Sequence, residues 1–184
     1  MTATGRKQET GGQQQAWIDK LQQLPPGKIM SFQIHALPAA QFESFFVLSD
    51  GQLAKARARR TVADDKPGYL CRVSLADAEI GETIMLLNFM HQPADSPFQA
   101  THAIFVRENA RQAFPDVGVV PEVLQSRLIS ARAFDDRHFM VDADVVDGAF
   151  LSKSIPAMLQ DSRVVYLQLH NAKLGCFLAC ATRS

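Results

Sequence analysis

The sequence predicts an α+β fold: a single domain built on a largely antiparallel β-sheet made from hairpins, with helices packed on it. The 184 residues are enough for one domain with a substantial core and few for two. The apolar fraction of 47% and the charged fraction of 21% are ordinary for a globular protein. Segments that look like strands come mostly in neighbouring pairs, with helical segments between the pairs, and this grouping favours α+β over a parallel α/β sheet.

Residues 1–29 are predicted to be a polar extension, and the globular domain is expected to cover 30–184. The stretch TGRKQETGGQQQ is too polar to bury enough surface to order itself. One loosely attached helix is expected after it, because Trp17 and Leu21 recur at helical spacing and a Pro-Pro-Gly run follows.

Removal of residues 1–29 is therefore expected to leave the stability of the domain nearly unchanged. A chain that begins at Met30 should melt within a few degrees of the full chain when circular dichroism follows unfolding. A collapse of the melting temperature would show instead that the apolar side chains of the extension complete the core.

Apolar periodicity and turn residues define the elements of the domain. Alternating or continuous apolar runs predict strands, and Pro, Ser or Asp before an apolar-periodic run predicts the start of a helix. Strands are expected at 30–37, 84–91, 101–108, 129–134, 138–146, 163–170 and 176–182. Helices are expected at 38–46, 51–58, 121–128 and 147–160, the last with Pro156 as a kink or as its true beginning.

Charge and cysteine usage indicate the compartment and exclude some partners. Nineteen basic and nineteen acidic side chains balance, which leaves little attraction to nucleic acid or anionic lipid. No apolar run reaches the roughly 18 residues that span a bilayer, and the polar N-terminus does not look like a secretory signal. Three cysteines, an odd number, favour reduced thiols over disulfides. We expect a cytoplasmic protein that binds neither nucleic acid nor membranes.

Two runs in the sequence are distinctive: His-Gln-Pro-Ala-Asp-Ser-Pro at 91–97 and His-Asn-Ala-Lys-Leu-Gly-Cys at 170–176. With the segments KPGYLCRVSLADAEIGE, VPEVLQSRLISARAFD and VDADVVDG, in this order along the chain, they resemble the bacterial family known as domain of unknown function 1203. The resemblance covers most of the chain from Met30 onward, which supports a domain boundary there. It implies no activity.

The segment between two histidines is the best candidate for a site. If His91 and His102 face each other across a hairpin, their Cβ atoms lie about 5 Å apart. The ten residues between them are more than the two to five usual for a hairpin loop, and they include Asp95 and Ser96. Histidines beside a carboxylate and a hydroxyl can hold a divalent metal or act as acid and base. The alternative is a loop whose histidines only bond backbone groups.

The closing hairpin gives a second group of candidates. If residues 171–175 form its loop, His170 faces Cys176, and the imidazole could lower the pKa of the thiol as in a Cys-His dyad. Asn171 would lie beside this pair. The alternatives are that Cys176 lines a ligand site or is an inert buried thiol.

Two arginines are candidate ligands for an anion. The guanidinium of Arg72 or Arg107 could bind a carboxylate or phosphate with two parallel hydrogen bonds. The alternatives are ordinary ion pairs, of Arg72 with Asp77 or Glu79 and of Arg107 across the sheet.

The two apolar strands that end in His91 and His170 are expected near the middle of one sheet. If they run in the same direction, both histidines open on one edge and share a pocket, and otherwise they lie well over 15 Å apart at about 3.3 Å per residue. We expect convergence, with the two histidines closer than about 10 Å.

Three functions follow from these candidates. The first is an enzyme-like pocket that acts on or binds a small polar metabolite, with a histidine as general base if the protein catalyses a reaction. The second is a non-catalytic module that binds an anionic small molecule, and the third is a structural or interaction protein. The sequence indicates no particular cofactor and leaves metal dependence open. The pocket residues expected are His91, Ser96, His102, His170, Asn171 and Cys176, with Arg72, Asp95 and Arg107 as further ligand-binding candidates.

Overall fold

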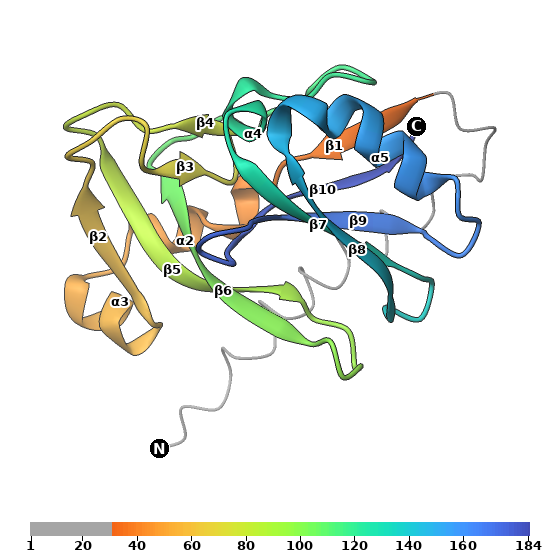
Figure 1. Cartoon of the computed structure of the whole chain (residues 1–184). Coiled ribbons are helices and arrows are strands. Elements are labelled where there is room, and N and C mark those ends of the chain that lie inside the picture. The colour runs from red at the N-terminus through yellow and green to blue at the C-terminus, as the bar shows by residue number, and fades with distance from the viewer. Residues whose placement is uncertain (1–30) are drawn as a thin grey trace.

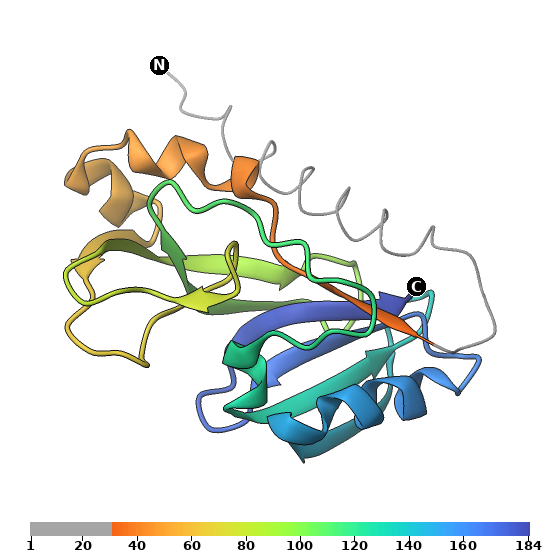
Figure 2. The ribbon, with the colours of Figure 1, turned by 90° about the horizontal axis from the view of Figure 1, so that it is seen from above.

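The protein forms two mostly antiparallel five-stranded sheets with a few short helices, which confirms the predicted α+β class. We describe residues 31–184 of a computed structural model, and the extension predicted at 1–29 lies outside this range. Figures 1 and 2 show the sheet formed by β2–β6 beside the sheet that carries α5. The sequence predicted one sheet, so the division into two is a finding of the structure.

The first sheet contains the N-terminal strand and the C-terminal half of the strands. All of its neighbouring strands are antiparallel. Its order is β1-β10-β9-β7-β8, with β1 (Phe32–His35), β7 (Leu128–Phe134), β8 (Met140–Asp147), β9 (Tyr166–Asn171) and β10 (Phe177–Arg183).

The second sheet is built around the long hairpin that carries His91 and His102. Its pairs are antiparallel except for β3, which lies parallel to β6 through Cys71 and Phe105. Its order is β2-β5-β6-β3-β4, with β2 (Ala58–Val62), β3 (Leu70–Cys71), β4 (Ala76–Asp77), β5 (Thr83–Gln92) and β6 (Ala100–Arg107).

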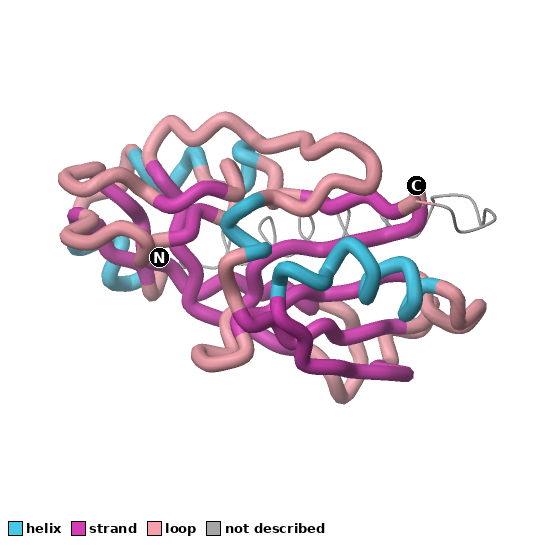
Figure 3. Tube along the Cα trace, turned by 45° about the horizontal axis from the view of Figure 1, so that its top comes forward, coloured by secondary structure: helices cyan, strands magenta, loops and turns pink. Residues whose placement is uncertain are grey.

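Most of the helices are short, as Figure 3 shows. The helix predicted at 38–46 is divided into a 3-10 turn and one α-helical turn, and the predicted helix at 51–58 ends early because Arg57 adopts a positive φ of 55°. Pro156 lies inside its helix. The bounds are η1 (Ala39–Gln41), α2 (Glu43–Phe46), α3 (Asp50–Lys55), α4 (Glu122–Gln125), η2 (Gly148–Phe150) and α5 (Leu151–Leu159).

The two faces of the first sheet have different partners, and this difference positions the site. Because side chains alternate along a strand, Leu167 and Leu169 of β9 share one core cluster with Ile155 of α5. The other face turns toward the second sheet. There, an apolar part formed around Phe89 and Phe177 adjoins buried polar side chains. These buried polar residues are Arg72, His91, Gln92, Gln168, His170 and Thr182.

Candidate functional site

Three histidines from the two sheets meet in the interior. The ring of His91 stacks on that of His102, with centroids 4.5 Å apart and planes 10° from parallel. His170 presents its ring edge-on to both, at 5.0 Å from His91 and 5.3 Å from His102. One nitrogen from each ring lies within 4.8 Å of the other two. We call these three residues the histidine cluster.

The histidine cluster forms, but the arrangement of strands that brings the three residues together differs from the one predicted from the sequence. The separation of 5.0 Å between His91 and His170 is below the expected 10 Å. The assumption that both strands share a sheet is wrong, because β5 and β9 belong to different sheets. The assumed pairing of His91 with His102 is also wrong: Phe89 faces His102, and the register shifts before Gln92. This irregularity brings the two rings into a stack instead of a direct cross-strand pair.

Gln168 fixes the orientation of His91. Its side-chain nitrogen donates to the backbone oxygen of His91 at 3.1 Å, so its side-chain oxygen is the acceptor. That oxygen lies 2.8 Å from Nδ1 of His91, which therefore carries the proton. The ring of Phe177 stacks on the other face of His91 at 5.3 Å and completes its immobilisation.

His170 is fixed by the loop that follows it. Its Nδ1 lies 3.0 Å from the backbone oxygen of Gly175, and its Nε2 lies 3.2 Å from the side-chain oxygen of Gln168. Both oxygens can only accept, and we assign the proton of the neutral ring to Nδ1 because that contact is the shorter one. In the neutral ring, Nε2 then has a free lone pair. A main-chain acceptor that fixes the tautomer in this way is typical of histidines that bind with the opposite nitrogen.

The cluster is held uncharged. Burial, followed by the charge of His102, lowers the pKa of His91 to about 3. Burial, followed by the charge of Arg132, lowers the pKa of His170 to about 2. The pKa of the half-buried His102 is lowered for the same reasons, burial first and then Arg132 and Arg72. At neutral pH the cluster therefore offers lone pairs rather than positive charge.

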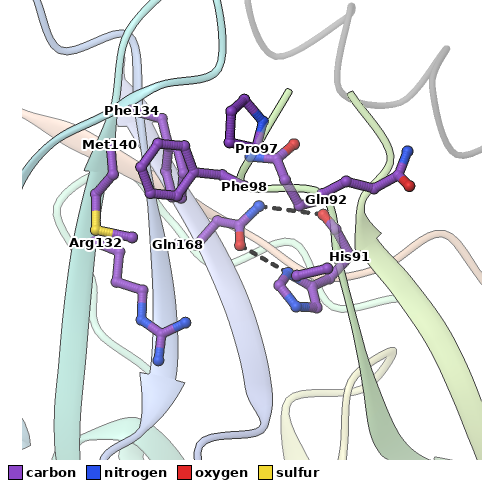
Figure 4. A pocket seen from close by; sticks show the side chains of 10 residues that line it. His91, Gln92, Pro97, Phe98, Arg132, Phe134, Met140 and Gln168 are labelled. Atoms are coloured by element: carbon purple, nitrogen blue, oxygen red, sulfur yellow. Dashed lines mark hydrogen bonds between the residues drawn. The ribbon is translucent and has the colours of Figure 1, made fainter. Parts of the chain in front are cut away.

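A cavity of about 230 Å³ lies beside the cluster, with His91 in its wall. Figure 4 shows Phe98, Phe134 and Met140 at one end and Arg132, Gln168 and His91 at the other. Pairing of Arg132 with Gln168 across β7 and β9 places both side chains on the same face of the first sheet. The remaining lining residues are Gln92, Pro97, Gln99 and Ala100.

A second polar group borders this cavity. Gln92 donates its side-chain N–H to the hydroxyl of Tyr166 at 2.7 Å, and that hydroxyl lies 2.9 Å from Nδ1 of His138. Burial raises the pKa of Tyr166 above its ordinary value, so the phenol stays protonated. The side-chain oxygen of Gln92 is buried and has no hydrogen-bond partner.

Three predicted site residues lie outside the cluster. Asp95 is exposed in the loop at 93–99. Ser96 bonds the backbone oxygen of His138 and the N–H of Phe98, so it holds the loop. Asn171 points to the opposite face of β9 from His170 and accepts from the N–H groups of residues 173 and 174. Ser96 and Asn171 fasten loops, and none of the three residues lines the cavity beside the histidines.

The proposed Cys-His pairing is wrong in register. His170 pairs with Phe177, and an irregularity follows in β10. The sulfur of Cys176 instead accepts from the guanidinium of Arg72 at 3.1 Å. Arg72 is buried and also donates to the backbone oxygens of Leu70 and Phe177. Among residues 31–184, the alternative ion pair of Arg72 with Asp77 or Glu79 is not formed. All three cysteines are free in the structure, and three reduced thiols remain a prediction.

Arg107 forms the ordinary ion pair that was the alternative to anion binding. Its guanidinium contacts the carboxylate of Glu82 at 2.5 Å. This contact raises the pKa of Arg107 and lowers that of Glu82. The ion pair between Arg107 and Glu82 lies at the far end of β6 from His102, away from the histidine cluster.

Sequence reasoning missed two residues of the site, Gln168 and Arg132. A signal was present for both, because Tyr166, Gln168 and His170 alternate with leucines, as Ser130 and Arg132 alternate with alanines. Period-2 alternation in a strand predicts a polar face. We predicted the run VVYLQL to be an apolar strand, but its polar side chains lie on one face, and that face packs against the other sheet.

Replacement Gln168→Leu is expected to destabilise the protein by about 2–4 kcal/mol, because it leaves the Nδ1–H and the backbone oxygen of His91 buried without partners. Urea unfolding measures the change. Gln99→Leu is the matched control, since Gln99 is exposed and makes one long bond of 3.3 Å, and its effect should stay within about 0.5 kcal/mol. Equal effects of the two substitutions would contradict the role given to Gln168.

The longest described helix, α5, has nine residues, and none of the described helices has the length and apolarity of a membrane span. No curated protein and no solved structure gives a significant match to the chain. Residues 68–183, which include the histidine cluster, Arg72 and Arg132, match the family described as "Protein of unknown function (DUF1203)". The chain therefore belongs to this family.

Proposed function

We propose that the protein binds a small anionic molecule in the cavity beside the histidine cluster, with Arg132 as the group that recognises the anion. The observation that carries this proposal is the guanidinium of Arg132 in the cavity wall. Among residues 31–184, no carboxylate lies within ion-pair distance of it. Its one hydrogen bond runs from Nε to the hydroxyl of Ser130 at 3.3 Å.

A guanidinium in this position favours a planar anion. Burial lowers the pKa of Arg132, which reflects the cost of holding the cation away from water. A carboxylate or phosphate offsets this cost and can accept two parallel N–H bonds from the planar fork. The terminal nitrogens of Arg132, which make no bond to the described residues, are available for this contact.

The rest of the cavity restricts the ligand further. Its volume of about 230 Å³ is below the roughly 300–1,000 Å³ of pockets for drug-sized molecules. The unpartnered side-chain oxygen of Gln92 favours a ligand with a hydroxyl or amino donor. Phe98, Phe134 and Met140 offer an apolar wall. A small hydroxy acid or phosphate monoester satisfies all three features.

Binding is better supported than proton abstraction by the buried histidines. A general base works best when its pKa lies near the working pH. The pKa values of about 3 for His91 and about 2 for His170 make both rings weak bases at neutral pH. The geometry thus favours the anion-binding alternative, with Arg132 in place of Arg72 and Arg107.

The test is a thermal-shift screen of the full chain against small carboxylic acids and phosphate monoesters, with inorganic phosphate and glycolate included. A ligand at 100 times its Kd adds about 2.7 kcal/mol to the stability of the native state. Arg132→Gln should weaken binding of each hit by roughly 10-fold or more. The control Arg59→Gln replaces an exposed arginine on β2 and should bind as the unmodified protein does. Hits that bind equally well to Arg132→Gln, or a screen with no hits, would overturn the proposal.

A further inference from the structure

We propose that His91, His102 and His170 form a binding site for one divalent transition-metal ion of the zinc type, with an open position for a further ligand. The proposal stands on the geometry of the cluster and does not depend on binding of an anion by Arg132. Each ring contributes one nitrogen, and the three nitrogens lie within 4.8 Å of one another. Imidazole nitrogen is a common ligand of zinc, copper, nickel and iron in proteins.

The positions of the protons on two of the rings favour metal binding. The side-chain oxygen of Gln168 and the backbone oxygen of Gly175 accept from Nδ1 of His91 and of His170. Both rings therefore keep Nε2 unprotonated. An acceptor on the far nitrogen of each ligand is the second-shell arrangement that orients histidines at metal sites.

The nitrogens that would bind the ion have no favourable hydrogen-bond partner. Nε2 of His91 and Nδ1 of His102 are buried and have no hydrogen-bond partner. Nε2 of His170 lies 3.2 Å from the side-chain oxygen of Gln168. Because both of these atoms carry lone pairs, their contact is repulsive unless a positive charge lies between them or beside them. A bound cation accepts the lone pair of each of the three nitrogens and so gives each of them a partner.

One of the three rings has to rotate before all three nitrogens can bind one ion. A tetrahedral ion with Zn–N distances of 2.0–2.1 Å holds its ligand nitrogens about 3.4 Å apart. The nearly parallel planes of His91 and His102 prevent their lone pairs from meeting at one point. His91 is 2% exposed and His170 is 0% exposed, and each is held by a hydrogen bond. His102 is half-buried and lies near the start of β6, close to the loop, so rotation of this ring completes the site.

The charges around the cluster determine the fourth ligand. Among residues 31–184, the group of potential metal ligands at this site consists of the three histidines and includes no carboxylate, and the positive charges of Arg132 and Arg72 act on His102. A dication next to two guanidinium groups is stabilised by an anion, so we expect hydroxide or an anionic ligand at the open position. Three protein ligands with one open position are characteristic of catalytic rather than structural zinc sites.

The test uses the full chain without a histidine tag, stripped of metal by a chelator. Zn²⁺ titrated by calorimetry should bind with one-to-one stoichiometry, and Co²⁺ should give the intense visible absorption of tetrahedral nitrogen ligation. His102→Ala should weaken Zn²⁺ binding by at least roughly 100-fold, more than the 10–100-fold typical of losing a second-shell partner. The control His35→Gln replaces a histidine of β1 outside the cluster and should leave Zn²⁺ affinity unchanged.

Two further measurements separate the possible results. Arg132→Gln should still bind Zn²⁺, so loss of anion binding and loss of metal binding are distinguishable. If His102→Ala does not fold, the Co²⁺ spectrum of the unmodified protein decides. Failure to bind one Zn²⁺, absence of the tetrahedral Co²⁺ spectrum, or equal Zn²⁺ affinities of His102→Ala and His35→Gln would overturn the proposal.

Discussion

Acidification of the metal-free protein from pH 6.5 to pH 5 is expected to lower its free energy of unfolding by about 5 kcal/mol. The native state holds three histidines neutral, because burial lowers the pKa of His35 to about 4, that of His91 to about 3 and that of His170 to about 2. In the unfolded chain all three have a pKa of about 6.5, so near and below that pH the unfolded state binds protons that the native state does not. Stability is therefore fully present well above pH 6.5 and is lost as pH falls, at a rate that approaches about 1.4 kcal/mol per unit for each histidine.

Urea unfolding at a series of pH values measures this effect. Carboxylates do not account for the loss above pH 5, because their ordinary pKa values lie near 4. The variant His91→Gln is expected to remove the contribution of one histidine, up to about 1.4 kcal/mol per pH unit, from the slope of stability against pH, whatever its effect on stability at pH 7. An unchanged slope in the variant, or constant stability of the unmodified protein between pH 6.5 and 5, would show that the cluster accepts protons in the native state.

Replacement Gly148→Ala is expected to destabilise the protein by about 3–5 kcal/mol. Gly148 begins η2, and its N–H donates to the backbone oxygen of Arg127 at 2.8 Å. A Cβ atom here would lie 1.9 Å from the backbone oxygen of Leu124 and 2.7 Å from that of Arg127. These oxygens belong to the main chain at the end of α4, where the side chain of Leu124 is fully buried, so they cannot move aside without loss of core packing.

The melting temperature measured by circular dichroism should fall by roughly 6–20 °C in Gly148→Ala. Gly51→Ala is the matched control. Gly51 lies in α3, and a Cβ atom added there meets no heavy atom within 4 Å. Since alanine is the better helix former, this control should be stabilised by about 0.5–1 kcal/mol. A Gly148→Ala protein that melts like Gly51→Ala would mean that α4 does not pack tightly against η2.

The sequence by itself determined the local structure wherever the hydrophobic pattern is strong. The strands that end in His91 and His170, and the hairpins formed by β5 with β6 and by β9 with β10, follow from apolar runs with turn residues between them. The hairpin formed by β5 and β6 also brings His91 and His102 close together in space. These features depend on neighbours in sequence, which is why residue types and their spacing were sufficient.

The hydrophobic pattern did not predict the structure correctly where pairing with a segment distant in sequence decides it. The β2 strand at Ala58–Val62 was not among the predicted strands, and its first residue falls within the helix expected at 51–58. It forms a strand because its backbone pairs with β5, and Arg60 bonds the carboxylate of Asp50. Strand propensity is weak compared with such pairing, so a short edge strand is difficult to recognise from its amino-acid composition.

The tertiary structure alone decided what the site contains. Whether strands join one sheet or two is settled by which faces find apolar cover, and here α5 covers one face of β9 while the second sheet covers the other. That packing brings His170 and Gln168 against His91, and it places Arg132 in a cavity wall. Irregular registers after Phe89 and Phe177 then set which rings touch, because a shift of one residue turns each side chain to the opposite face. The candidate residues were readable from the sequence, but their contacts depend on long-range packing that residue spacing does not encode.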